Sequence, residues 1–139
     1  MATILLITQD PVLALAYEAR LEKAGFQVAH ASSGYASLDI AKECMPACLL
    51  VDAQLPGLHG LGLLKWLTDV PMLVQIPVVL LAERTLAPSV IEECVFWGAR
   101  RVSYKDADPP EDIAAVIRAA LAAKPVPSEV EGPAAAAAS

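Results

Sequence analysis

The stretch Leu49–Gly60, which reads LLVDAQLPGLHG, contains the pattern that decides the fold. Together with Cys48, its first residues form a short apolar run, as expected of a strand that is buried on both faces of a parallel sheet. The run ends at Asp52, and a loop containing proline and glycine follows. Open α/β sheets bind ligands at the carboxyl ends of their strands. Asp52 is therefore the first candidate functional residue.

Four other short runs predict the remaining strands of the same sheet: Thr3–Thr8, Gln27–Ala31, Val78–Ala82 and Arg101–Tyr104. Helical patterns lie between and after the five runs, including one over residues 61–70 and one from residue 110 to residue 124. This alternation predicts an α/β fold with five helices on both faces of a doubly wound, five-stranded parallel sheet. The expected architecture is flavodoxin-like, with strand order 2-1-3-4-5.

The composition predicts one folded domain over residues 1–124. The chain has 139 residues, of which 56% are hydrophobic, and its mean hydropathy is +0.51. A chain of this size and composition can bury a sizeable core. Residues 125–139 are rich in proline and alanine, so we expect them to form a disordered tail or linker.

Charge and cysteine usage exclude several classes of function. The formal net charge is -6, which argues against a nucleic-acid partner because phosphate binding needs clustered lysine and arginine. No apolar run approaches the ~18 residues of a membrane span. Cys44, Cys48 and Cys94 lack metal-ligand spacing, and no signal peptide is recognisable. These features predict a cytoplasmic protein that contacts neither nucleic acid nor membrane.

Four motifs in the right order resemble the receiver domain of bacterial two-component response regulators. The strongest is residues 49–60, which resemble the family's strand ending in the phospho-accepting aspartate. Residues 76–81 resemble its fourth strand, and Gly98-Ala99 with Lys105 resembles the signature around its fifth strand. Asp10-Pro11 after the first apolar run also resembles the family's sequence at this place. The resemblance covers roughly residues 3–123 and implies a phosphorelay signalling module.

The resemblance also implies a set of site residues, of which this chain keeps two. Asp52 occupies the acceptor position, and Lys105 occupies the position of the lysine that pairs with the phosphoryl group. The family's acidic pair for Mg²⁺ aligns with Thr8-Gln9, and its phosphoryl-contacting Thr or Ser aligns with Ala82. Lys105 is followed by Asp106 where the family usually has proline. Asp52 and Lys105 can therefore simply pair with each other.

Asp10 has two interpretations. It can turn inward and join Asp52 as a ligand of Mg²⁺, or it can cap the helix that begins at Pro11. Aspartate followed by proline is typical of a helix start, so the capping role is favoured. The expected magnesium site is weak or absent, and no other cofactor is predicted.

The leading hypothesis is a signal-transduction module with a degenerate phosphorylation site. It would bind a protein partner, either a histidine kinase or an output protein, and would not be an enzyme. The alternative is a genuine receiver phosphorylated on Asp52 by a histidine kinase. A nucleotide- or flavin-binding enzyme is disfavoured, because Thr8-Gln9-Asp10-Pro11 stands where a glycine-rich phosphate loop would follow the first strand.

The family's output face implies where a partner would bind, namely on the fourth helix, fifth strand and fifth helix. The candidate interface residues share this face: Val90, Phe96, Trp97, Val102 and Tyr104. The two aromatic residues of the helix either complete a local core or contact a partner or a second copy of the chain. Helical spacing predicts that Val95 faces the core together with Ile91 and Cys94.

Overall fold

The computed structural model describes residues 2–55 and 59–122. The predicted tail over residues 125–139 lies outside the described residues, as do residues 56–58 of the loop after Asp52.

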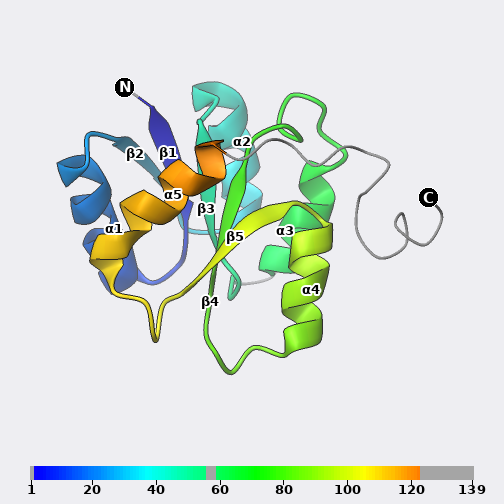
Figure 1. The fold of residues 1–139 in the computed structure, drawn as a ribbon. Coiled ribbons are helices and arrows are strands. Elements are labelled where there is room, and N and C mark those ends of the chain that lie inside the picture. Colours follow the sequence, from blue (N-terminus) through cyan, green and yellow to red (C-terminus); the bar gives the residue numbers. More distant parts are fainter. Residues whose placement is uncertain (1, 56–58, 123–139) are drawn as a thin grey trace.

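The sheet has five parallel strands in the order β2-β1-β3-β4-β5, which confirms the predicted fold class (Figure 1). The strands are β1 (Thr3–Ile7), β2 (Gln27–Ala31), β3 (Cys48–Asp52), β4 (Val78–Ala82) and β5 (Ala99–Tyr104). β3 and β4 are buried along their whole length, because helices cover both faces of the sheet at its centre. The edge strand β2 carries exposed residues, as its mixed sequence predicts.

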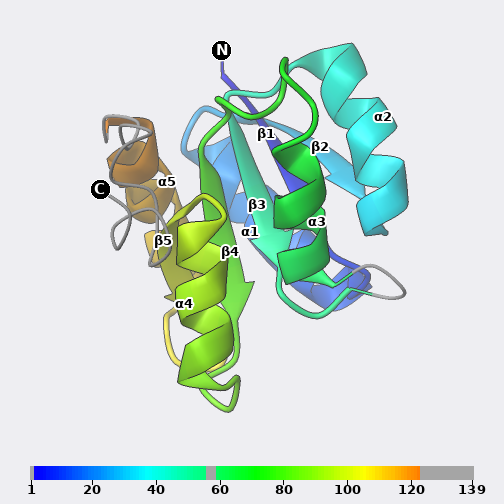
Figure 2. The ribbon, with the colours of Figure 1, turned by 90° about the vertical axis from the view of Figure 1, so that its right-hand side faces the viewer.

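Five helices cover the sheet. They are α1 (Pro11–Lys23), α2 (Gly34–Cys44), α3 (Gly60–Leu67), α4 (Pro88–Phe96) and α5 (Ile113–Ala122), with a short 3₁₀ helix at Pro110–Asp112 before α5. α1 and α5 pack on one face, and α2, α3 and α4 pack on the other (Figures 1 and 2). The chain is thus a three-layer α/β/α sandwich.

Several element boundaries differ from the sequence prediction: β1 ends at Ile7 rather than Thr8, and α5 begins at Ile113 rather than at residue 110. α3 ends at Leu67 rather than near residue 70, because the backbone N–H groups of residues 68–70 bond to carbonyl oxygens three residues back rather than four. The hydroxyl of Thr68 also donates a 2.6 Å hydrogen bond to the carbonyl oxygen of Lys65. This bond satisfies one of the last carbonyls of the helix, and turns follow up to β4. β5 begins two residues earlier than expected, where Ala99 pairs with Val78 beside an irregularity in the register.

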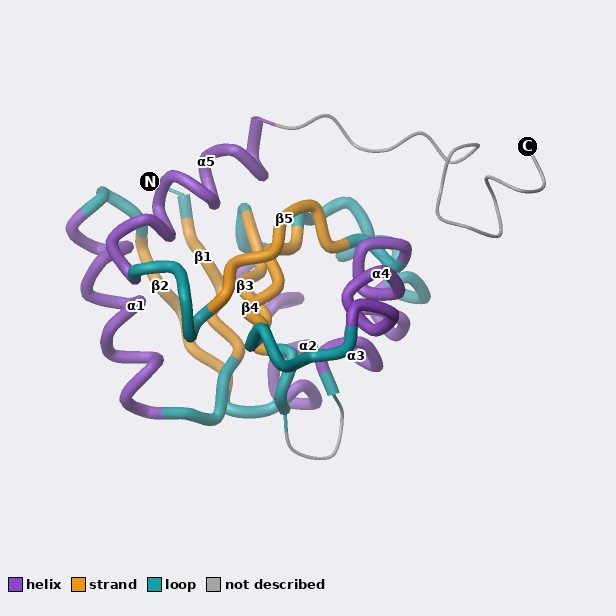
Figure 3. Tube along the Cα trace, turned by 60° about the horizontal axis from the view of Figure 1, so that its bottom comes forward, coloured by secondary structure: helices purple, strands orange, loops and turns teal. Residues whose placement is uncertain are grey.

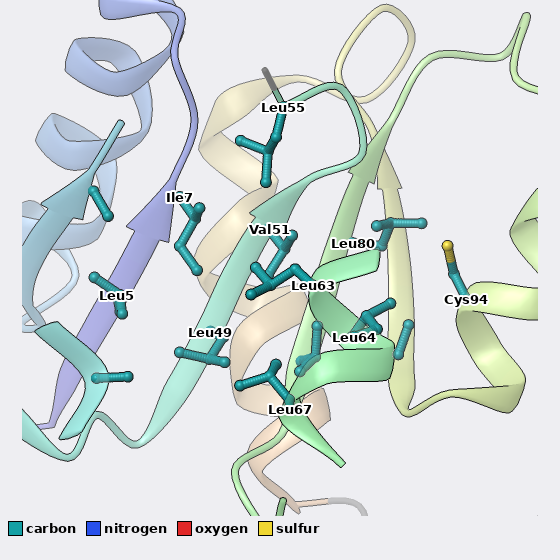
Figure 4. Close-up of a cluster of buried hydrophobic side chains, with 14 of the residues drawn as sticks. Leu5, Ile7, Leu49, Val51, Leu55, Leu63, Leu64, Leu67, Leu80 and Cys94 are labelled. Atoms are coloured by element: carbon teal, nitrogen blue, oxygen red, sulfur yellow. The ribbon is translucent and has the colours of Figure 1, made fainter. Parts of the chain in front are cut away.

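The strands divide their side chains between two cores. Leu5 and Ile7 of β1 pack with α2, α3 and α4, whereas Ile4 and Leu6 pack with α1 and α5. Figure 4 shows the first of these cores, in which leucines of α3 lie over β3 and β4. This alternation follows from the two-residue period of a strand. Because all five strands are parallel, the carboxyl ends of β1, β3, β4 and β5 lie at one edge of the sheet (Figure 3).

The three cysteines differ in their accessibility. Cys48 and Cys94 are buried, as expected for small apolar groups, whereas Cys44 is exposed at the end of α2. Burial raises the pKa of the Cys48 thiol to about 12. Burial also raises the pKa of Cys94, so neither buried thiol forms a reactive thiolate near neutral pH.

We therefore expect one fast and two slow thiols in the folded protein. At pH 8, a disulfide reagent such as dithionitrobenzoate should modify Cys44 rapidly and the other two only after unfolding. Cys44→Ser should remove the fast phase. Rapid modification of Cys48 in folded Cys44→Ser protein would contradict the burial of β3.

Candidate functional site

Asp52 lies at the carboxyl end of the central strand β3 and is only 2% exposed. Its Oδ2 atom accepts a 2.8 Å hydrogen bond from the hydroxyl of Thr8. Its Oδ1 atom accepts bonds from Nζ of Lys105 at 2.7 Å and from the backbone N–H of Gln54 at 2.9 Å. Both carboxylate oxygens are therefore engaged by groups of this chain.

Lys105 reaches Asp52 across the end of β4. It follows β5, and its backbone N–H donates a 2.9 Å hydrogen bond to the carbonyl oxygen of Ala82, the last residue of β4. Its side chain is 12% exposed, so the ion pair with Asp52 is shielded from water. Ala82 is fully buried between the two strand ends, and its methyl group offers no hydrogen-bond donor. The structure thus pairs Asp52 with Lys105, an arrangement that the sequence allowed but did not require.

Thr8 contacts Asp52 at the position where the resemblance places an acidic residue. Its hydroxyl oxygen donates to Asp52 and accepts a 3.2 Å bond from the backbone N–H of Asp10. Its carbonyl oxygen lies 2.9 Å from Nε2 of His30 on β2. Thr8 is completely buried, and these bonds fix its side chain against the carboxylate. The sequence showed that Thr8 departs from the family pattern, but it did not show that Thr8 donates a hydrogen bond to Asp52.

Asp10 caps α1 rather than facing Asp52. Its Oδ1 atom accepts hydrogen bonds from the backbone N–H groups of Val12 and Leu13, at 3.0 and 3.2 Å. This is the arrangement of a helix N-cap, in which a side-chain oxygen satisfies the free donors of the first turn. The interpretation that the sequence favoured for Asp10 is therefore confirmed.

Asp52 is the carboxylate that the end of β3 would offer to a magnesium ion. Mg²⁺ is bound through one or two carboxylates, and here Gln9 is neutral and Asp10 is occupied at the helix cap. Both oxygens of Asp52 already accept hydrogen bonds. Among residues 2–55 and 59–122, no three His, Cys, Asp or Glu side chains are grouped as metal ligands.

Asp106 connects two loops beside the site. Its carboxylate oxygens accept bonds of 3.1 and 3.3 Å from the backbone N–H of Arg84, which lies in the loop between β4 and α4. Nε of Arg84 also lies 3.6 Å from Oδ2 of Asp106. The signal in the sequence was an acidic residue after Lys105 where proline is usual. Its partner could not be read from the sequence, because the two residues belong to different loops.

The model of the response regulator receiver domain matches residues 4–118, which is most of the chain. The chain belongs to the response regulator receiver family. Its curated relatives include the polar-differentiation response regulator DivK of Brucella ovis, which is 41% identical over 59 residues. That match covers 42% of this chain and 48% of DivK, so it spans about half the length of the curated relative.

Solved structures agree with this receiver fold. A putative response regulator from Chloroflexus aurantiacus has 26% sequence identity and a TM-score of 0.80, with 88% of this chain and 98% of that one covered. The chemotaxis response regulator CheY4 of Vibrio cholerae has 21% identity and a TM-score of 0.79, with 86% and 98% covered. The likeness to CheY4 concerns the fold alone.

Most of the predicted interface residues of the receiver domain are partly buried and pack against its core. The rings of Phe96 and Trp97 contact each other edge to face, with centroids 5.1 Å apart. Trp97 packs on the core beneath α4, and three further predicted interface residues do the same: Val90, Val102 and Tyr104.

Val95 was expected in the core but is 52% exposed, so that prediction was wrong. The face of α4 that packs inward carries Cys94, which is fully buried, with Val90 and Ile91. Helical spacing alone did not distinguish this face from the one that carries Val95.

No helix in the described part of the receiver domain is long and apolar enough to cross a membrane.

The buried pair of Asp52 and Lys105 gives a stability test. Lys105→Met should destabilise the domain by about 3–5 kcal/mol, because it leaves the Asp52 carboxylate without its counter-charge. Adding Asp52→Asn should recover part of the loss, with a coupling of about 1–3 kcal/mol in a double-mutant cycle. Urea unfolding of the four proteins measures both values. Strictly additive effects would show that the pair contributes no mutual stabilisation.

Proposed function

We propose that this receiver domain is a signal-transduction interaction module whose phosphorylation site is held closed, and that it acts by binding a protein partner. The observation that carries the proposal is the complete engagement of Asp52 by Thr8, Lys105 and the backbone of Gln54. The Asp52 carboxylate is thus paired with groups of its own chain.

Phosphoryl transfer would be slow at such a site for a physical reason. The reaction depends on positioning and on neutralising the charge of the transferred group, to which a metal ion and hydrogen-bond donors contribute. Here the metal carboxylates are replaced by Thr8 and Gln9, and Ala82 offers no hydroxyl. Loss of one oriented stabilising group typically costs about 10²–10³ in rate. Two or three such losses would leave little transfer on the time scale of signalling.

The function would then lie in the surface rather than in catalysis. The proposed contact face comprises α4, β5 and α5, where Val95 is exposed and Phe96 is half-buried against Trp97. Aromatic and large apolar residues are favoured at the centres of protein interfaces. This face would receive a histidine kinase, an output protein or a second copy of the chain.

A genuine phosphorylated receiver is the second candidate, and the retention of both Asp52 and Lys105 favours it. In that case Lys105 would leave its ion pair and neutralise charge on the phosphoryl group. Thr8 would have to release Oδ2 of Asp52, the oxygen that it now holds.

The first test is the intact mass after incubation with acetyl phosphate and Mg²⁺. The wild type and Asp52→Asn should both remain unmodified while an ordinary receiver is labelled under the same conditions. A single phosphoryl adduct on the wild type that is absent from Asp52→Asn would establish the second candidate and sink the first.

A restored variant provides the matched control. Thr8→Asp, Gln9→Asp and Ala82→Thr together return the missing carboxylates and hydroxyl to their positions. This variant should bind Mg²⁺, seen as a rise in its melting temperature that the wild type does not show, and it should take up one phosphoryl group on Asp52. If it stays folded and unlabelled, the three positions do not account for the lack of transfer.

The proposed contact face is tested through assembly. If copies of the chain associate through α4, the weight-average mass should rise with concentration in sedimentation experiments. Phe96→Glu should then shift the protein to monomers, because it places a charge in a desolvated contact. Leu15→Glu, on the exposed side of α1, is the control and should leave association unchanged. Association that survives Phe96→Glu would remove this face from the proposal.

A further inference from the structure

The facing sides of α3 and α4 enclose a groove of about 520 Å³ beside the end of β3. Figure 2 shows the two helices side by side on one face of the sheet. The groove has an apolar body with contributions from both helices and the adjoining loops: Ala53, Leu55, Leu61, Gly62, Leu86, Val90 and Cys94. Its volume lies within the range of small-molecule sites, about 300–1,000 Å³.

The polar part of the lining carries no negative charge. It consists of Gln9, Gln54, His59 and Lys65, and no Asp or Glu lines it among the residues that the structure describes. This absence contrasts with the whole chain, in which 16 acidic residues outnumber 10 basic ones. The groove is therefore an apolar site with a positive charge at its wall, on a protein of net charge -6.

Lys65 is available to an anionic ligand. The ion pairs between described side chains are Arg84–Asp106 and Lys105–Asp52, so no carboxylate of the described chain neutralises the Lys65 ammonium. Its Nζ atom lies 5.8 Å from the ring centroid of Trp97, which is not among the residues that line the groove. A ligand carboxylate can bind this ammonium without displacing an ion pair.

We propose that the groove binds a small apolar organic anion, with an aromatic or branched aliphatic body carrying one carboxylate. The body would pack against Leu61, Leu86 and Val90, and the carboxylate would bind Lys65. Charge complementarity selects this class, because a cationic ligand would meet Lys65 and a neutral one would gain nothing from it.

A ligand in this groove would act on α4 directly. Val90 belongs to α4 and Leu86 to the loop before it, whereas Leu61 and Lys65 belong to α3. Bridging the two helices stabilises one position of α4, the helix that carries the proposed partner face. The signal would thus enter as a bound molecule and would not require phosphorylation of Asp52.

The probe is 2-naphthoate, titrated into the full chain by calorimetry. Binding should saturate with a Kd of about 1 mM or tighter, as expected for a compact ligand of this size. 2-Naphthalenemethanol has the same rings without the charge and should bind about two- to fivefold more weakly. No saturation of the wild type by about 5 mM naphthoate, or equal binding of both compounds, would overturn the proposal.

Three variants locate the site. Val90→Glu places a carboxylate in the groove and should weaken naphthoate binding at least tenfold, an effect of about 1.4 kcal/mol. Val95→Glu makes the same change outside the groove on the same helix and should leave the Kd unchanged. Lys65→Gln should retain binding of the neutral alcohol and lose the preference for the anion.

Equal weakening by Val90→Glu and Val95→Glu would overturn the assignment, as would an anion preference that survives Lys65→Gln. The Lys65 comparison is made between two ligands on one folded variant, so a loss of stability cannot imitate it. The proposal is independent of the phosphorylation measurement, and failure of either leaves the other standing.

Discussion

Each oxygen of a buried carboxylate needs a hydrogen-bond donor or a cation as a partner. The residues around the end of β3 supply such partners to Asp52. Asp52 is 2% exposed and receives a hydroxyl from the first strand end, an ammonium from beyond the fifth and a backbone N–H from its own loop. A buried charge without such partners would be strongly destabilising. The three bonds also tie β1 and the segment after β5 to the central strand. The Asp52 carboxylate is thereby held in place where β3 ends.

The parallel topology makes this arrangement possible. Residues far apart in the chain meet at Asp52 because all five strands run in the same direction and end at one edge. The close start of α3 completes the geometry. A Cβ atom on Gly60 would lie 2.8 Å from the Cα of Ala53, so only glycine allows the helix to begin this near to β3. The apolar cores on the two faces of the sheet fix the positions of the strand ends. They thereby also fix the positions of the polar side chains around Asp52.

The sheet order and the place of Asp52 could be predicted from the sequence, because buried strands and the residues that end them leave local patterns. The pairing of Asp52 with Lys105 was allowed by the sequence but not required. The hydrogen bond from Thr8 to Asp52 could not be predicted from the sequence. A threonine in place of an acidic residue indicates only that a carboxylate is missing, and it does not reveal a new bond between strand ends. Val95 was placed wrongly because helical spacing specifies faces but not which face meets the core. The groove depends on the separation of α3 and α4, a distance between elements that no local pattern contains.

Lys105 and Asp106 are neighbours in the chain but stand in different electrostatic surroundings. The ammonium of Lys105 is shielded with Asp52, whereas the carboxylate of Asp106 and the guanidinium of Arg84 are 37% and 67% exposed. Dissolved salt screens exposed charges far more than buried ones. A rise in ionic strength is therefore expected to weaken the Arg84–Asp106 ion pair more than the Lys105–Asp52 ion pair. Two neighbouring residues thus make one contact that salt hardly affects and one contact, between the segment after β5 and the loop before α4, that salt weakens.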